Sequence, residues 1–183
     1  MEQRFENVLG QYHRIHPDAK IGKNVRIGLG TVIEDGCSIG DNSLIGHHTV
    51  LRPETHVGNN SIISHSCVCE GRAEIGNHVS IHAGCGLTMG IIIEDDVFIG
   101  GNMSSTNTKN IVFGRKHKWV WEPCRINRGA RIGSGVVLLP RVVIGSNAYV
   151  GSGAVVTKDI PEKQVWVGNP ARYLRDVPES EWL

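Results

Sequence analysis

Aliphatic side chains recur every six residues along most of the chain. From Ile15 to Ile99, every sixth position holds an aliphatic residue, with Cys69 as the one exception. A six-residue period fits neither the 3.6-residue period of an α-helix nor the two-residue alternation of a strand. It predicts a short strand followed by a tight turn, repeated many times.

Two further columns accompany the aliphatic one. Two residues before each aliphatic residue stands a position that is mostly small or β-branched, as at Val25, Thr31 and Cys37. Residues two apart on a strand share a face, so both columns should point inward. Glycine often follows the aliphatic residue directly, where we expect it to supply a turn dihedral that a Cβ would resist. These glycines are Gly22, Gly28, Gly40, Gly46, Gly58, Gly76 and Gly100.

Three six-residue units make 18 residues, which is one coil of a parallel β-helix. Successive coils would stack as parallel strands about 4.8 Å apart and would bury their aliphatic side chains against each other. The predicted fold is therefore all-β, with about seven coils over residues 15–104 and 126–160.

The repeat breaks once. After Ile99 the pattern resumes at Ile126 in a new phase, because the gap of 27 is not a multiple of six. We expect residues 105–125 to form a protruding loop. Its sequence NTKNIVFGRKHKWVWE contains several basic residues and two tryptophans. Long loops in compact domains tend to be functional.

Both ends need something to cover the open β-helix. Phe5, Val8, Leu9 and Tyr12 stand at helical spacing, which predicts an amphipathic capping helix within residues 1–14. Residues 161–183 form a C-terminal extension. In that extension we expect a short helix over 171–176, directly after Pro170.

Composition narrows the class of protein. Glycine accounts for 23 of 183 residues, but no Gly-X-Y repeat runs through the chain, which excludes collagen. The net charge of +1 and the lack of a basic stripe argue against nucleic-acid binding. No apolar run approaches the roughly 20 residues of a transmembrane helix. The N-terminus has no signal-peptide core, so we expect a cytoplasmic protein with no membrane partner. The five cysteines match no zinc or redox motif and should be buried, reduced thiols.

The repeat resembles that of the hexapeptide-repeat acyltransferases, whose fold is a left-handed parallel β-helix. The closing segment GSGAVVTKDIPEKQVWVGNPARYL is similar to the family's last coil and exit. The stretch EDDVFIGGNMSSTN is similar to nucleotide-sugar N-acetyltransferases. The resemblance implies a homotrimer that binds acetyl-CoA between adjacent β-helices. It also implies an acceptor amino sugar carried on a nucleotide diphosphate.

Acetyl transfer to a hydroxyl needs a general base, whereas a sugar amine can lose its proton to water before binding. Histidine is the usual base near neutral pH. His47, His65 and His82 fall on one edge of the predicted β-helix, as a ridge over successive coils. We favour His82 as the catalytic base because it is the ridge histidine nearest the loop, and His65 is the second candidate.

The loop mouth and the last coils supply the candidate binding residues. Asn102 and Asn107 should lie beside the loop mouth, where they could hold the sugar or the acetyl carbonyl. Trp119 and Trp121 could stack on a nucleotide base or on adenine. Gly135, Gly153 and Ala154 leave room for the pantetheine arm of CoA. The exit motif implies that Lys158 and Arg172 contact its phosphates. The mid-chain corners without glycine, at Ser64, Glu70, His82 and Thr88, are where we expect the site.

Other functions remain open. One is an O-acetyltransferase acting on a sugar or small molecule. A second is a zinc protein like the γ-type carbonic anhydrases, because NNSIISHSCVCEG resembles their metal region and places His65 at one ligand. This chain has Glu70 where a second histidine would be expected, so the preferred interpretation includes no metal. A third is a non-catalytic β-helix scaffold.

Overall fold

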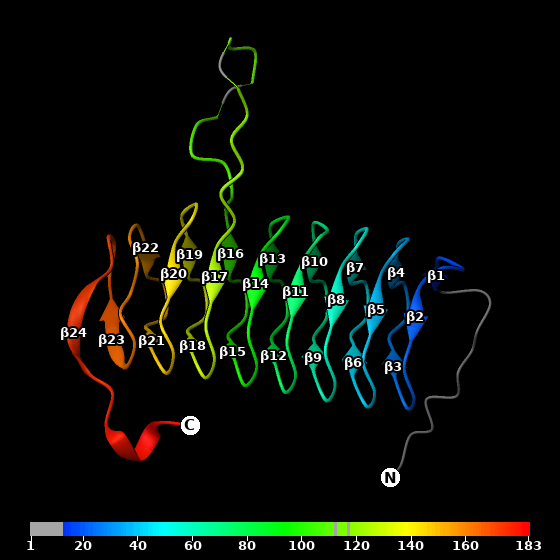
Figure 1. The fold of residues 1–183 in the computed structure, drawn as a ribbon, viewed down its shortest axis with the longest axis horizontal. Helices are drawn as coiled ribbons and strands as arrows, with labels where there is room; N and C mark the ends of the chain where they lie inside the picture. The colour runs from blue at the N-terminus through cyan, green and yellow to red at the C-terminus, as the bar shows by residue number, and fades with distance from the viewer. Residues whose placement is uncertain (1–12, 112, 117) are drawn as a thin grey trace.

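The computed structural model describes residues 13–111, 113–116 and 118–183. These residues form a left-handed parallel β-helix whose axis runs along the long dimension of Figure 1. The predicted N-terminal capping helix lies almost entirely outside the described residues.

Three sheets form the faces of the β-helix, and parallel strands pair within each face. The first face contains β1 (Arg14–Ile15), β4 (Val32–Ile33), β7 (Val50–Leu51), β10 (Val68–Cys69), β13 (Gly86–Leu87), β16 (Ser104–Ser105), β19 (Val137–Leu138) and β22 (Val155–Val156). The second face contains β2 (Lys20–Ile21), β5 (Ser38–Ile39), β8 (His56–Val57), β11 (Glu74–Ile75), β14 (Ile92–Ile93), β17 (Arg125–Ile126) and β20 (Val143–Ile144).

The third face also holds the end of the chain. It contains β3 (Arg26–Ile27), β6 (Leu44–Ile45), β9 (Ile62–Ile63), β12 (Ser80–Ile81), β15 (Phe98–Ile99), β18 (Arg131–Ile132), β21 (Tyr149–Val150), β23 (Gln164–Val167) and β24 (Arg172–Asp176). A 3-10 helix, η1 (Glu179–Glu181), follows. Because eight strands stack on the first face, the described β-helix has about eight turns rather than about seven.

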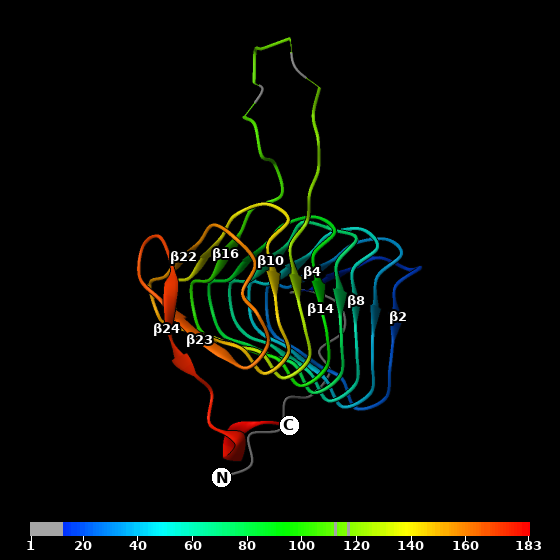
Figure 2. The same cartoon turned by 60° about the vertical axis from the view of Figure 1, so that its left-hand side comes forward.

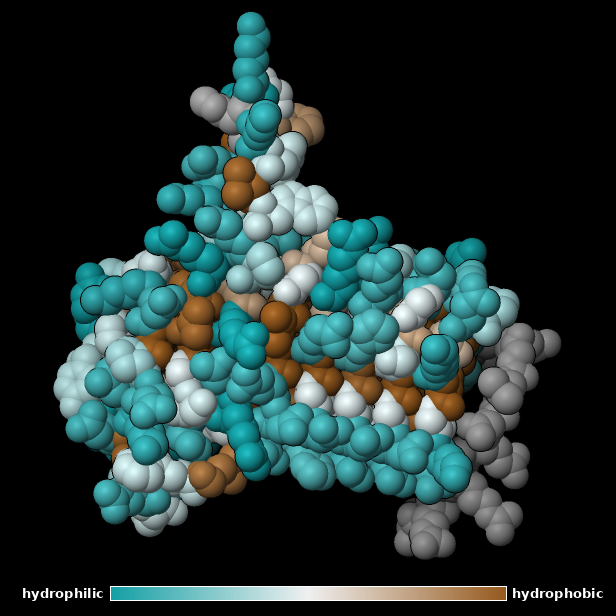
Figure 3. All heavy atoms as spheres, in the orientation of Figure 1, coloured by the Kyte–Doolittle hydropathy of each residue, from teal (hydrophilic) through white to brown (hydrophobic). Residues whose placement is uncertain are grey.

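The predicted 18-residue register is confirmed on every face. Cys69, for example, pairs with Leu51 on one side and Leu87 on the other. The aliphatic column is buried as a continuous core, with Ile63, Ile81 and Ile99 fully inaccessible. Figure 3 shows the consequence at the surface, where hydrophobic, neutral and hydrophilic side chains run in parallel rows along the axis.

The second inward column tolerates hydroxyls and thiols because each finds a carbonyl acceptor on the next turn. Thr31 Oγ1 donates to Gly46 O at 2.9 Å, and Ser61 Oγ donates to Gly76 O at 2.9 Å. Cys67 and Cys85 make the equivalent contacts through Sγ. Buried polar groups with such partners cost little. All five cysteines are buried and free, as the sequence predicts.

The glycines that follow the aliphatic column have a different role from the one expected. None of these seven has a positive φ; the left-handed residue comes two positions later, as at Asn24, Asn42 and His48. The glycines are required for space, since a Cβ at Gly58 would lie 2.5 Å from the carbonyl carbon of Gly76 on the next turn. Such a separation is well inside van der Waals contact.

The corners of the β-helix carry different residues, and three names distinguish them. The Asx corner joins the second face to the third and holds Asp41, Asn59, Asn77 and Asp95. The histidine corner joins the third face to the first and holds His47, His65 and His82. The loop corner joins the first face to the second and holds Glu34, Arg52, Glu70, Thr88 and Thr106.

The long insertion leaves from the loop corner, between β16 and β17, and stands away from the body in Figures 1 and 2. Ile126 pairs with Ile93, 33 residues earlier, so this turn is 15 residues longer than the others. Ser104 still pairs with Gly86 on one side and Val137 on the other, which explains why the break in the pattern adds no gap to the sheet.

The predicted C-terminal helix is wrong. Arg172–Asp176 is β24, which pairs antiparallel with β23. After β22 the chain has reached the free edge of the third face, and unpaired edge groups favour another strand over an isolated helix of this length. The tail then folds back, where Arg131 Nη1 lies 2.6 Å from Glu181 Oε2 and Lys163 Nζ lies 3.9 Å from the Trp182 ring centroid.

Candidate functional site

The neck of the protruding loop is held by backbone hydrogen bonds. Glu122 N donates to Asn107 O at 2.7 Å, and Arg141 N donates to Glu122 O at 2.7 Å. An antiparallel bridge joins Thr108 to Trp121. Each arm of the loop is thus tied to the other and to the next turn of the β-helix, so the side chains at the neck have fixed positions.

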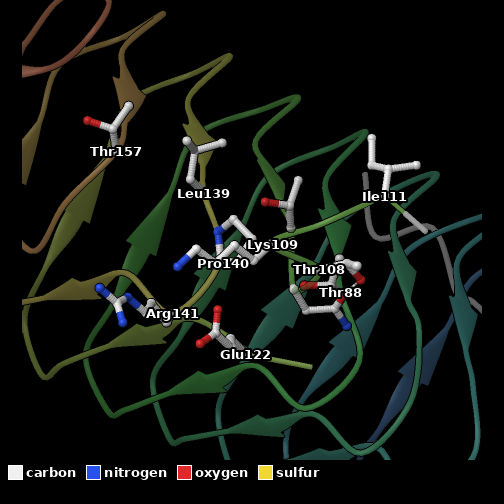
Figure 4. Close-up of a pocket in the computed structure, with 11 residues that line it drawn as sticks. Thr88, Thr108, Lys109, Ile111, Glu122, Leu139, Pro140, Arg141 and Thr157 are labelled. Carbon is white, nitrogen blue, oxygen red and sulfur yellow. Dashed lines mark hydrogen bonds between the residues drawn. The ribbon is translucent and has the colours of Figure 1, made fainter. Parts of the chain in front are cut away.

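A cavity of about 630 Å³ lies on one side of this neck (Figure 4). Its floor consists of loop-corner residues from successive turns, and its wall consists of residues from both arms of the loop. Arg141 and Glu122 lie side by side at one end. The lining residues are Thr88, Thr106, Asn107, Thr108, Lys109, Ile111, Glu122, Leu139, Pro140, Arg141 and Thr157. We call this the threonine cavity.

The threonine cavity is rich in groups that bind anions and hydroxyls. Lys109 and Arg141 are cations, and Thr106 Oγ1 already donates to Leu138 O at 2.9 Å. Glu122 is the one carboxylate in the lining, and its Oε2 atom is buried without a hydrogen-bond partner. A buried carboxylate oxygen without a donor is costly, and such groups need an explanation.

A second cavity of about 620 Å³ lies on the other side of Asn107 and Thr108. It is lined by Glu70, Met89, Asn107, Thr108, Trp119 and Trp121, and we call it the tryptophan cavity. Asn107 is fixed between the two cavities, since its Nδ2 donates to Met89 O at 3.2 Å and its Oδ1 accepts from Thr108 Oγ1. Of the predicted binding residues, the structure therefore brings together Asn107, Trp119 and Trp121.

His47 and His65 stack on the histidine corner with ring centroids 5.0 Å apart. The Nδ1 atom of His65 accepts a hydrogen bond from His47 N at 2.9 Å, and that of His47 accepts one from Leu29 N at 2.8 Å. A neutral imidazole whose Nδ1 accepts carries its proton on Nε2. The His65 ring is therefore held by the preceding turn, with its Nδ1 atom already used as an acceptor.

The expected ridge is only partly aligned. His82 lies one residue out of step with His65, in the column of Gly46 and Ser64, and Ala83 takes the place above His65. The His82 ring is exposed and packs edge-on against Phe98 with centroids 4.9 Å apart. Within the described part of the chain, no hydrogen bond engages the His82 ring.

The structure separates His82 and Asn102 from the loop. Both stand on the histidine corner, whereas the loop leaves from the loop corner, and the first face lies between. Asn102 has a φ of 58° and is the left-handed residue of its turn. The expectation that Asn102 lies at the loop mouth, and that His82 borders the loop within one chain, is therefore wrong. Position in the 18-residue repeat could have revealed this, because Thr106 comes 24 residues after His82, one turn plus one corner.

The lack of glycine also has a different meaning at the different corners. On the loop corner no turn has glycine at the position directly after the aliphatic residue, so Glu70 and Thr88 are not exceptions. On the histidine corner Ser64 and His82 replace glycines that are present at Gly28, Gly46 and Gly100. Only Ser64 and His82 therefore depart from the repeat.

The candidate CoA residues fall into two groups. Gly135 and Gly153 occupy equivalent left-handed positions of the histidine corner, with φ of 68° and 71° and open space around both. Ala154 is fully buried, and its N–H and carbonyl already bond to Gly151 and Val137. Lys158 follows the loop corner instead and lies 5.1 Å from the Trp166 ring centroid. Arg172 is exposed on β24, and its Nη1 donates to Ala171 O.

Among the described residues, no group of three or more His, Cys, Asp and Glu side chains is arranged to hold a metal ion. No helix in the same part of the chain has the length and hydrophobicity needed to cross a bilayer.

Comparisons with known proteins agree with the repeat. The family model of the GMPPB C-terminal domain matches residues 9–113, more than half of the chain, and the bacterial transferase hexapeptide model matches residues 123–158. The galactoside O-acetyltransferase of Escherichia coli is 36% identical over 94 residues, which covers 50% of this chain and 46% of that protein. The chain spans about half the length of the curated relatives it matches.

Solved structures share the fold. A UDP-N-acetylglucosamine acyltransferase from Bacteroides fragilis aligns with a TM-score of 0.71 at 20% identity, over 91% of this chain and 73% of that chain. A hexapeptide-repeat acetyltransferase from Vibrio cholerae, complexed with acetyl coenzyme A, aligns with a TM-score of 0.59 at 23% identity, over 79% and 72%. With its 18-residue β-helix register and two matching family models, this chain belongs to the hexapeptide-repeat transferase family.

Proposed function

We propose that this protein is an acetyl-CoA-dependent acetyltransferase that N-acetylates an amino sugar carried on a nucleotide diphosphate. The observation that carries the proposal is the pair of cavities at the loop neck, which share Asn107 and Thr108. One cavity offers cations for phosphate oxygens, and the other offers aromatic faces. An acceptor with a charged diphosphate and a ring to be stacked needs both.

The reaction joins an amine to an acetyl thioester. The amine nitrogen forms a bond to the carbonyl carbon, the carbon–sulfur bond breaks, and the amine proton ends on the CoA thiol by way of solvent. The protein must hold the two reactants together and bind the developing oxyanion. Asn107 is suited to the first task because it lies between the two cavities with its amide held in place.

Acetyl-CoA is the proposed donor. The open left-handed corners at Gly135 and Gly153 leave space for an extended pantetheine arm along the β-helix axis. Lys158 and Arg172 are the cations proposed for the CoA phosphates, and both are exposed near the last turns. The buried Ala154, with its backbone groups already bonded, would support the arm only through the shape of its turn.

A second copy of the chain is needed to complete the site. His82 and Asn102 are on the histidine corner and the two cavities are on the loop corner, so one chain presents the two halves on opposite edges of its first face. In a cyclic homotrimer, the histidine corner of one subunit would face the loop corner of the next. We propose such a trimer as the active form.

In this arrangement His82 is the proposed general base, since its ring is exposed and His65 is bonded into a turn. We expect His82→Ala to lower turnover at least tenfold if a protein base is used. A folded trimer with near-normal turnover would show that the substrate amine loses its proton without His82.

The acceptor is tested by measuring thiol release from acetyl-CoA with a panel of amino-sugar nucleotides and plain alcohols. We expect turnover only with the amines. The similarity to a galactoside O-acetyltransferase favours O-acetylation as the second candidate, and a preference for hydroxyl acceptors would establish it.

The shared site is tested by mixing two inactive variants, His82→Ala and Asn107→Ala, after unfolding and refolding together. In each mixed trimer one of the three interfaces would carry both intact residues. A 1:1 mixture should then recover about a quarter of wild-type activity. Failure to recover any activity, with mixed trimers demonstrated, would place both residues in the same subunit's site.

A further inference from the structure

The tryptophan cavity combines aromatic faces with a carboxylate. Trp119 and Trp121 stand on one arm of the loop and remain 58% and 52% exposed, and Met89 lies on the floor. Glu70 closes the cavity from the turn below. Large aromatic side chains that stay half exposed at a cavity wall are unusual unless something else covers them.

Glu70 has no obvious structural partner. On the same corner, Glu34 lies 3.9 Å from Arg52, and Glu54 lies 3.0 Å from Arg72. Among the described residues, no hydrogen bond or ion pair engages the Glu70 carboxylate. Its negative charge therefore faces the cavity without a cationic partner from the described part of the chain.

We propose that the tryptophan cavity first binds the acceptor in its ammonium form, with Glu70 as the counter-ion and Trp119 and Trp121 as the aromatic walls. The bound ammonium then loses one proton to the general base before its nitrogen attacks the thioester. A cation over a tryptophan face is attracted by the ring's negative electrostatic potential, and this attraction is stronger for tryptophan than for other side chains. A carboxylate beside the rings adds a charge-assisted hydrogen bond. Met89 contributes a polarisable surface that tolerates the attached carbon skeleton.

The neighbouring threonine cavity has the opposite character. Lys109 and Arg141 give it two cations against one carboxylate, whereas the tryptophan cavity holds Glu70 and no cationic side chain in its lining. The two cavities thus discriminate the two ends of a ligand that carries both an ammonium and an anionic group. This assignment rests on the proposed function for the identity of the ligand, but the binding of a cation does not require any turnover.

The experiment is a tryptophan-fluorescence titration of the full chain with tetramethylammonium chloride at constant ionic strength. A neutral alcohol of similar size, tert-butanol, is the comparison ligand. We expect a saturable change with the cation and none with the alcohol. The signal should disappear in the double variant Trp119→Leu with Trp121→Leu, which leaves Trp166 and Trp182 in place.

The carboxylate is tested by Glu70→Gln, which removes the charge and keeps the shape. We expect at least a fivefold weaker affinity for tetramethylammonium. Glu34→Gln is the matched control, because it stands at the same corner position two turns earlier, and it should leave the affinity unchanged. Sedimentation of each variant shows whether the oligomer is intact.

Two results would overturn the assignment. One is the lack of a saturable change in the wild-type protein, as expected if the tryptophans are covered by a second copy. The other is equal affinity in the Glu70→Gln variant. A saturable, Glu70-dependent response to the cation in a protein that acetylates no amine would instead confirm the cation site and refute the proposed function, and with it the identity of the ligand.

Discussion

Replacement of His65 separates a structural role from a catalytic one. Its Nδ1 atom accepts the His47 N–H at 2.9 Å, and its ring stacks on that of His47. On the Asx corner the same position is filled by Asn59, whose Oδ1 accepts Asp41 N at 2.7 Å. An asparagine at position 65 could therefore replace the imidazole as the acceptor in this turn.

The magnitude follows from these two contacts. His65→Ala loses one hydrogen bond, worth about 1 kcal/mol when the donor can still reach water. It also loses a ring contact worth about 0.5 kcal/mol. The sum of about 1.5 kcal/mol corresponds to a fall in Tm of about 3–6 °C for a chain of this size. His65→Asn should recover most of this loss.

Thermal unfolding followed by circular dichroism measures the stability, and thiol release measures the activity. Asn59→Ala is the control, since it removes the equivalent bond from Asp41 N on another edge, at 2.7 Å. We expect it to lower Tm by a similar amount. The reasoning is refuted if His65→Asn melts like the wild type but loses tenfold or more of its activity, because His65 would then act on the substrate.

Four further predictions test the fold. Gly58→Ala should prevent or strongly impair folding, because its Cβ would lie 2.5 Å from Gly76 on the next turn. The Cβ of Gly135→Ala would meet no atom, so this variant should lower the free energy of unfolding by only about 1 kcal/mol, the cost of its φ of 68°. Urea unfolding measures both. Ile81→Ala should destabilise by about 2–5 kcal/mol and Ile81→Val by about 0.5–1.5 kcal/mol, because this side chain is fully buried in the core. All five thiols should resist Ellman's reagent until the chain is unfolded; burial raises the pKa of Cys69 and raises that of Cys124 to about 11, and a single fast-reacting thiol in the native protein would contradict the buried column. The backbone N–H of Arg128 and the ion pair with Arg125 lower the pKa of Glu94. Glu94→Gln should therefore lower the free energy of unfolding by about 0.5 kcal/mol near neutral pH. This difference from the wild type should vanish as the pH falls through the lowered pKa of Glu94 in the folded state.

The repeat was readable from the sequence because it is local. Each six-residue unit contains its own strand, its inward column and its corner, and parallel stacking fixes the 18-residue register. The aliphatic column from Ile15 to Ile99, the resumption at Ile126 and the protruding loop between them followed from spacing alone. The buried thiols followed as well, because they share the column of serine and threonine.

The sequence was less informative about which edge each residue occupies. His82, Asn102 and the loop are close along the chain, but a third of a turn places them on different edges of the first face. The glycines looked like turn residues, although only the stacking of one turn on the next reveals that they make room for the neighbouring backbone. Segment 172–176 became a strand because the edge of β23 was available.

The sequence by itself determined the β-helix, its register and the position of the insertion, since these depend on residues within one repeat. Only the tertiary structure decided the site. Glu70, Asn107 and Arg141 come from three different turns and Glu122 from the second arm of the loop, and the cavities exist because the loop neck is bonded across them. Contacts between turns depend on how the chain stacks, and a six-residue pattern repeats equally at all three corners.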